Sequence, residues 1–164
     1  MDVYILRHGK AEDARPGTGD ADRRLTKKGR AEIFAAGRWM AAQELRFDLI
    51  AASPLIRAQE TATIIAESLG EKDQLATWKV LAPGGLPDEV CRVISKQRDA
   101  RAILLVGHEP LLSALISHII TGNERAAIAM SKGALAKIRE FTYPVSPSGE
   151  LHWLVTTALM ADKQ

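Results

Sequence analysis

The stretch Val3-Tyr4-Ile5-Leu6-Arg7-His8-Gly9-Lys10 decides how the rest of this chain is interpreted. Its first four residues are apolar and rich in β-branched and aromatic side chains, which predicts a fully buried strand. The apolar run stops at Arg7, His8 and Gly9, so the carboxyl end of the strand presents an arginine and a histidine. Ligands bind at the carboxyl ends of the strands in open α/β sheets. We therefore expect an anion site there, with His8 as a nucleophile or base.

Two later apolar runs also end in polar residues, at what would be the same edge of the sheet. The first is followed by Ser53-Pro54-Leu55-Ile56-Arg57-Ala58, and the second by Gly107-His108-Glu109-Pro110. Arg57 falls in the first turn of a predicted helix, where free backbone N–H groups already favour an anion. Ser53 is the predicted cap of that helix, with Pro54 in its first turn. The purely structural interpretation of Arg57 is an ion pair with Glu60.

The pattern along the chain alternates between strands and helices. Strands are predicted over residues 3–6, 48–52, 75–81 and 103–106, helices over 27–45, 54–69, 87–97 and 110–121, and a final hairpin over 134–142 and 150–157. Thr26 is the predicted cap of the first helix. The predicted buried face of that helix consists of Phe34, Gly37, Ala41 and Leu45. This order predicts an α/β protein, a three-layer α/β/α sandwich whose mostly parallel sheet has one antiparallel strand near an edge.

With its segments in this order, the chain resembles the histidine phosphatase superfamily, whose fold is phosphoglycerate-mutase-like, and within it the short SixA-type phosphohistidine phosphatases. The matching motifs are Arg7-His8-Gly9, Leu25-Thr26-x-x-Gly29, Ser53-Pro54-x-x-Arg57-Ala58-x-x-Thr61-Ala62, Leu81-x-Pro83-x-Gly85 and Gly107-His108-x-Pro110. The resemblance covers essentially the whole chain, so we expect residues 1–164 to form a single histidine-phosphatase domain. It implies that His8, followed by Gly9, carries the phosphoryl group and that His108 binds phosphate.

The chemistry of phosphoryl transfer agrees with these residue types. A transferring phosphoryl group spreads negative charge over three oxygens, so it needs fixed cations around it. Arg7 and Arg57 offer planar forks that suit these oxygens, and with Gly9 and His108 they form the predicted phosphate-binding set. His8 must be neutral to attack, and the nearby positive groups should lower its pKa. The expected mechanism is a transient phosphohistidine on His8 that water then hydrolyses.

The motifs do not specify which residue donates a proton to the leaving group. Many larger relatives place a glutamate or aspartate over the leaving group, in a segment that this chain largely lacks. Asp88 and Glu89 are the candidates by position, because they follow the Pro83-Gly84-Gly85 turn. Acidic residues in the first turn of a helix are also favourable in any protein. The role of Lys10 is open as well.

A basic cluster straddles the start of the first predicted helix; it consists of Arg23, Arg24, Lys27, Lys28 and Arg30. It can be a solvated first turn without further function. It can also be a positive rim that attracts a phosphorylated, acidic partner, because this helix starts on the same sheet edge as His8.

Composition excludes several other classes of protein. A net charge of +2 without basic tails does not favour nucleic-acid binding, and no apolar run is long enough to span a bilayer. The chain starts without a signal-peptide pattern, so the cytoplasm is the expected location and no membrane partner is expected. The lone Cys91 excludes an internal disulfide framework, and no histidines stand at ligand spacing, so no metal and no cofactor are expected. His118 and His152 are interpreted as packed residues.

The sequence therefore predicts a metal-independent phosphatase that acts on phosphohistidine in a protein. A phosphomonoesterase for small molecules on the same fold is the first alternative. A phosphoryl mutase is disfavoured, because the short chain leaves little for a lid that excludes water. A non-catalytic module that binds a phosphoprotein is the last alternative, and the presence of His8 argues against it.

Overall fold

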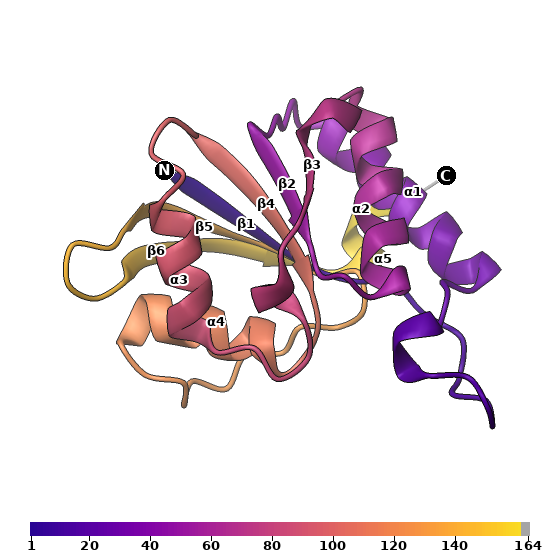
Figure 1. Cartoon of the computed structure of the whole chain (residues 1–164). Coiled ribbons are helices and arrows are strands. Elements are labelled where there is room, and N and C mark those ends of the chain that lie inside the picture. The colour runs from indigo at the N-terminus through magenta and orange to yellow at the C-terminus, as the bar shows by residue number, and fades with distance from the viewer. Residues whose placement is uncertain (162–164) are drawn as a thin grey trace.

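Six strands form one mixed sheet with β1 near its middle (Figure 1). The computed structural model describes residues 1–161. Their strands are β1 (Asp2–Arg7), β2 (Leu49–Ala52), β3 (Leu75–Thr77), β4 (Ala102–Gly107), β5 (Leu135–Thr142) and β6 (Ser148–Val155), in the spatial order β3-β2-β4-β1-β5-β6. The first four strands of this order pair in parallel, whereas β5 runs antiparallel to both of its neighbours. The prediction of one antiparallel strand near an edge is confirmed.

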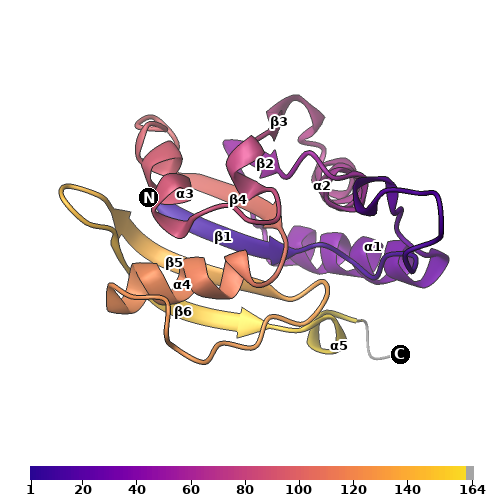
Figure 2. The ribbon, with the colours of Figure 1, turned by 60° about the horizontal axis from the view of Figure 1, so that its bottom comes forward.

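Helices cover both faces of the sheet, which confirms the three-layer prediction (Figures 1 and 2). Helices α1 (Lys27–Ala42), α2 (Ile56–Leu69) and α5 (Thr157–Met160) pack on one face, and α3 (Pro87–Ser95) and α4 (Leu111–Thr121) pack on the other. In the described part of the chain, three short 3-10 helices complete the connections: η1 (Asp20–Asp22), η2 (Lys72–Gln74) and η3 (Lys79–Leu81). Within residues 1–161, no helix has both the length and the apolar composition needed to cross a membrane.

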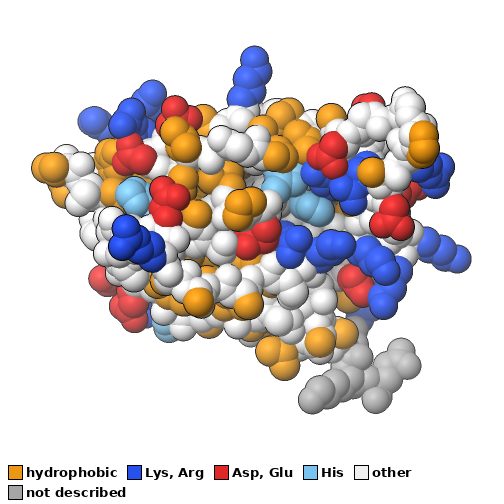
Figure 3. Space-filling model, turned by 90° about the horizontal axis from the view of Figure 1, so that it is seen from below, with side chains coloured by type: hydrophobic (Ala, Val, Ile, Leu, Met, Phe, Trp, Pro, Cys, Tyr) orange, Lys and Arg blue, Asp and Glu red, His pale blue; other side chains and the backbone are white. Residues whose placement is uncertain are grey.

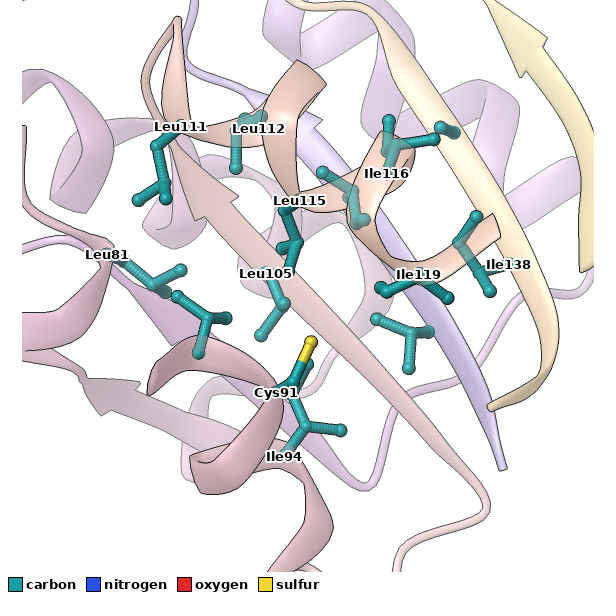
Figure 4. Close-up of a cluster of buried hydrophobic side chains, with 14 of the residues drawn as sticks. Leu81, Cys91, Ile94, Leu105, Leu111, Leu112, Leu115, Ile116, Ile119 and Ile138 are labelled. Atoms are coloured by element: carbon teal, nitrogen blue, oxygen red, sulfur yellow. The ribbon is translucent and has the colours of Figure 1, made fainter. Parts of the chain in front are cut away.

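Leucine and isoleucine side chains dominate the core under α3 and α4 (Figure 4). Leu105 of β4 lies between Cys91 and Ile94 of α3 and Leu112 and Leu115 of α4, and all five are fully buried. Each such aliphatic side chain contributes roughly 1.5–3 kcal/mol to folding. Burial also raises the pKa of the Cys91 thiol to about 12, so this cysteine is a packing residue.

The buried face of α1 differs from the predicted one. Ile33, Ala36, Gly37 and Met40 are buried, whereas Phe34 is 54% exposed. The helix is rich in apolar residues, so two neighbouring stripes both satisfy a 3.6-residue period, and the periodicity alone selected the wrong one. Gly37 belongs to both stripes; a Cβ atom there would lie 2.5 Å from Ser68 Oγ of α2, so α1 and α2 approach closely at this point.

Several element boundaries also differ from the predicted ones, including the end of α3 at Ser95 and the last strand, which covers Ser148–Val155. Helix α1 ends at Ala42, and the predicted strand 75–81 divides into β3 and η3. Helix α2 starts at Ile56 with Leu55 as its N-cap, and no side chain caps it. Ser53 therefore lies before the helix; its hydroxyl oxygen accepts from Leu55 N at 3.3 Å and lies 2.7 Å from His108 Nε2. In contrast, Thr26 caps α1 as predicted, because its hydroxyl oxygen accepts a hydrogen bond from Gly29 N.

Candidate active site

The ends of β1 and β4 bring two histidines together. The two strands pair in parallel with Arg7 opposite Gly107, so the next residue of each strand is a histidine. The backbone N–H of His8 donates to Gly107 O at 3.1 Å. The rings of His8 and His108 lie with their centroids 5.0 Å apart and tilted by 55°. Figure 3 shows histidine side chains in this edge of the molecule, with Lys and Arg side chains beside them.

The His8 ring is held in one tautomer. Its Nδ1 lies 2.7 Å from the carbonyl oxygen of Gly9, which can only accept, so Nδ1 carries the proton. Its Nε2 is then the basic nitrogen, and Arg57 Nε donates to it at 3.4 Å. Burial lowers the pKa of His8 from 6.5 to about 3, and the nearby His108, Arg57 and Arg7 act in the same direction. His8 is therefore neutral at physiological pH, with the lone pair of Nε2 available for attack.

Arg57 reaches His8 from the first turn of α2. Its side chain is only 6% exposed. Besides the contact with His8, its terminal nitrogens donate to the backbone oxygen and the Oδ2 of Asp20, at 2.7 and 2.9 Å. The predicted structural alternative, an ion pair with Glu60, is not formed, because Glu60 pairs with Arg24 and Arg30 instead.

Arg7 is fixed by the chain that precedes β5. Its NH1 group donates to the carbonyl oxygen of Met130 at 2.7 Å. The backbone N–H of Gly133 is shared between the carbonyl oxygens of Arg7 and His8, at 3.1 and 3.2 Å. The Nε atom of Arg7 is buried and has no hydrogen-bond partner within residues 1–161. A buried donor without a partner is costly, so this N–H is suited to an anionic ligand.

His108 is positioned by Ser53, which was predicted to cap the second helix. Its Nε2 lies 2.7 Å from Ser53 Oγ, and both residues are buried. Its Nδ1 is also buried and has no partner in the described part of the chain. Burial and the positive charge of Arg57 lower the pKa of His108 to about 4, so this ring is neutral as well.

Close backbone packing holds the loop that carries His8. The N–H of Gly9 donates to Thr61 Oγ1 at 3.1 Å, and the Thr61 hydroxyl donates to Arg57 O at 2.7 Å. A Cβ atom on Gly29 would lie 2.1 Å from the carbonyl oxygen of Lys10, so only glycine fits there. The glycines of the motifs therefore allow α1 and α2 to approach this loop, and the backbone of Lys10 is part of that contact.

Within residues 1–161, Asp88 forms no hydrogen bond or ion pair with His8 or His108. Tyr143 donates to Asp88 Oδ1 at 2.9 Å, and Arg92 pairs with Oδ2 at 2.6 Å. These contacts hold the Asp88 carboxylate in a cluster with Tyr143 and Arg92. The hydrogen bond from Tyr143 is the first cause that holds the pKa of Asp88 below its usual value. Glu89 is exposed, and no hydrogen bond or ion pair of its side chain occurs within residues 1–161.

The basic cluster at the start of α1 is largely paired with carboxylates. Arg23 bonds to Asp20, Arg24 and Arg30 pair with Glu60, and Lys28 pairs with Glu32. These pairs reduce the positive potential that the cluster can present to a partner. His118 is largely buried, as predicted, with Nε2 lying 3.7 Å from Asp88 Oδ1. The prediction that His152 is packed is wrong, because this side chain is exposed on β6.

The arrangement as a whole combines an uncharged imidazole nitrogen with guanidinium and imidazole groups around it. Such a site can bind a tetrahedral oxyanion and attack it. No group of three or more His, Cys, Asp or Glu side chains among residues 1–161 is arranged to hold a metal ion. Asp20, Ser53 and Thr61 were not predicted as site residues, although Ser53 and Thr61 stand within a motif quoted above.

Comparisons with known proteins bear on the family and on the fold. A family model of the histidine phosphatase superfamily (branch 1) matches residues 3–82. An uncharacterised protein of Picosynechococcus sp. is 31% identical over 142 residues, which are 85% of each chain. Phosphohistidine phosphatase SixA of Escherichia coli (strain K12) is 26% identical over 156 residues, which are 93% of this chain and 92% of that protein. The solved structure of the protein histidine phosphatase SixA complexed with tungstate has the same fold, with a TM-score of 0.86 at 23% identity over 98% of this chain and 99% of that chain.

Proposed function

Because the chain belongs to the histidine phosphatase superfamily, we propose that it removes the phosphoryl group from phosphohistidine on a protein, through a covalent intermediate on His8. The observation that carries the proposal is the state of the His8 ring. Its Nδ1 proton is held by the Gly9 carbonyl, and its pKa of about 3 leaves Nε2 unprotonated at physiological pH.

In the proposed reaction, Nε2 of His8 attacks phosphorus while the bond to the leaving group breaks on the opposite side. The guanidinium groups of Arg7 and Arg57 and the ring of His108 bind the phosphoryl oxygens. Arg7 Nε and His108 Nδ1 support this assignment, since both are buried donors or acceptors without a partner in the described residues. Water then attacks the phosphohistidine, and His8 leaves with its Nδ1 proton still bound to Gly9 O. None of these steps uses a metal or a cofactor.

The choice of phosphohistidine as substrate rests on the leaving group. Expelling an alkoxide needs a proton donor, because general acid catalysis contributes roughly 10²–10⁴-fold. A protonated imidazole ring leaves as a neutral molecule and needs no such donor. The carboxylate of Asp88 is bonded to Tyr143 and Arg92, and these contacts lower its pKa and keep it ionised, so it is not poised as a proton donor. The similarity to phosphohistidine phosphatase SixA points to the same substrate class.

A comparison of three substrates tests the proposal. We expect kcat/KM to be highest for a protein carrying phosphohistidine, lower for an aryl phosphate and lowest for glycerol phosphate. Vanadate should inhibit, and a chelator should have no effect. Asp88→Asn and Glu89→Gln should change the phosphohistidine activity less than twofold. Alkyl phosphate hydrolysis that matches phosphohistidine hydrolysis and collapses in either variant would instead establish a phosphomonoesterase for small molecules.

A further inference from the structure

Asp20 lies beside the proposed site although no motif includes it. It begins η1, and Figure 2 shows this dark indigo segment after β1 lying beside the start of α2. One carboxylate oxygen, Oδ2, accepts from Arg57 NH2 at 2.9 Å, and the other, Oδ1, accepts from Arg23 NH1 at 2.9 Å. The backbone oxygen of Asp20 accepts from Arg57 NH1 at 2.7 Å. The carboxylate therefore bridges two arginines, one of which contacts His8.

The Asp20 carboxylate is a negative charge at the mouth of the site. The hydrogen bonds from Arg23 and then Arg57 hold its pKa below the usual value, so it is ionised at neutral pH. It is also close enough to His108 to act on that ring, since its charge raises the pKa of His108 against the effects of burial and Arg57. Its side chain is 57% exposed, whereas that of Arg57 is 6% exposed. The carboxylate thus faces the guanidinium groups of Arg23 and Arg57 and acts on the neutral ring of His108 on one side, and it faces solvent on the other.

The guanidinium group of Arg57 separates His8 from Asp20. Its Nε faces His8 Nε2, and its two terminal nitrogens face Asp20. In phosphoryl transfer, the attacking atom and the leaving group lie in line on opposite sides of phosphorus. A phosphoryl group bound along this guanidinium with His8 on the inner side has its leaving group on the outer side, toward Asp20 and solvent.

We propose that Asp20 is a specificity-determining residue that selects a positively charged leaving group, the protonated imidazole ring of phosphohistidine. The inference rests on the proposed function and specifies that the phosphohistidine ring is protonated when it binds. The ionised carboxylate accepts a hydrogen bond from the free N–H of the phosphorylated ring and stabilises its positive charge. The same carboxylate repels the negative charge that develops on the oxygen of a phosphate ester.

The reaction balances without a proton donor. The lone pair of His8 Nε2 forms the new P–N bond, and the electron pair of the breaking P–N bond returns to the substrate ring. That ring keeps the proton on its other nitrogen and leaves as neutral imidazole. The enzyme retains phosphohistidine at His8, with the Nδ1 proton still donated to Gly9 O, until water attacks phosphorus. The electron pair of that P–N bond then returns to His8 Nε2, and the protons of the water stay on the released phosphate. Asp20 takes up no proton in either step.

Asp20 could instead act only by positioning Arg57. The variant Asp20→Asn separates the two roles at Arg57. The amide oxygen can still accept from Arg57 NH2, and the backbone oxygen of residue 20 still accepts from NH1, so the acceptor that is lost is the one for Arg23 NH1. A loss of position would lower the activity on every substrate by the same factor. A loss of charge would lower the activity on phosphohistidine, whose leaving group is positively charged, but not the activity on a phosphate ester, whose leaving oxygen becomes negative.

The experiment measures kcat/KM of wild type, Asp20→Asn and Asp22→Asn on a phosphohistidine-bearing protein at pH 6 and on an aryl phosphate. Asp22 is the matched control, since it lies on the same 3-10 helix and its carboxylate forms no hydrogen bond or ion pair within residues 1–161. We expect Asp20→Asn to lose about tenfold on phosphohistidine, the scale of one charge-assisted hydrogen bond, and to keep or exceed wild-type activity on the aryl phosphate. Asp22→Asn should match wild type on both.

Equal losses of Asp20→Asn on both substrates would overturn the inference in favour of positioning, and unchanged activity on both would overturn it outright. The proposed function is tested by the wild-type protein alone: it fails if wild-type kcat/KM is not higher on the phosphohistidine-bearing protein than on the aryl phosphate.

Discussion

The two buried neutral histidines should make the stability of this protein depend on pH. In the unfolded chain both rings take up a proton below pH 6.5, whereas in the folded protein the pKa of His8 is about 3 and that of His108 about 4. Between these values the unfolded state binds more protons, so stability is fully present above pH 6.5 and is lost as the pH falls toward 4. From pH 7 to pH 5 each ring costs roughly 2 kcal/mol, and the pair costs about 4 kcal/mol, of the free energy of unfolding.

Urea denaturation at pH 7 and pH 5, in buffers without phosphate, measures this loss. His8→Asn removes one of the two rings, so the variant should lose about 2 kcal/mol less than wild type over this interval. His152→Asn is the control, since His152 is exposed on β6, and it should behave as wild type. Glu71 acts in the opposite direction, because burial raises its pKa, but it is present in all three proteins. Equal losses in wild type and His8→Asn would refute the assignment of His8 as a buried neutral ring.

Three substitutions test how the site is built. Arg57→Lys keeps the charge but loses the planar fork, so kcat/KM should fall about 10²–10³-fold, the cost of one oriented donor; activity within fivefold of wild type would contradict this. Ser53→Ala removes the hydrogen bond to His108 and should lower stability by about 1 kcal/mol and kcat by about tenfold; an unchanged kcat would show that this bond does not position the ring. Gly29→Ala places a Cβ atom 2.1 Å from Lys10 O and should lower the free energy of unfolding by at least about 2 kcal/mol; wild-type melting would contradict the packing.

The fold was predictable because local patterns and chain order agree. Short β-branched runs ending in polar residues located β1 and β4, and Gly70 and Gly122 end α2 and α4 in left-handed conformations, as glycine allows. The buried face of α1 was not predictable, because Ile33 and Phe34 lie on adjacent stripes of an alanine-rich helix. Only the position of the sheet decides which stripe is covered.

The site was predictable where residues follow the ends of strands. His8 and His108 belong to neighbouring parallel strands, and strand pairing alone places them side by side. Asp20 could not be found in this way, since it lies in a polar loop 37 residues from Arg57 and only the tertiary fold joins them. Ser53 shows a different limit, because a hydroxyl before a helix can cap it or bond elsewhere, and here it bonds to His108.

The most direct test of the account is to trap the phosphoryl group on the enzyme. A radiolabelled aryl phosphate is mixed rapidly with wild type and quenched in alkali, and the label is mapped by proteolysis. We expect an acid-labile, alkali-stable phosphate on the peptide that contains His8. In His8→Ala, both this phosphate and turnover should be lost while the melting temperature is unchanged. Label on another residue, or turnover that persists in His8→Ala, would contradict the covalent mechanism.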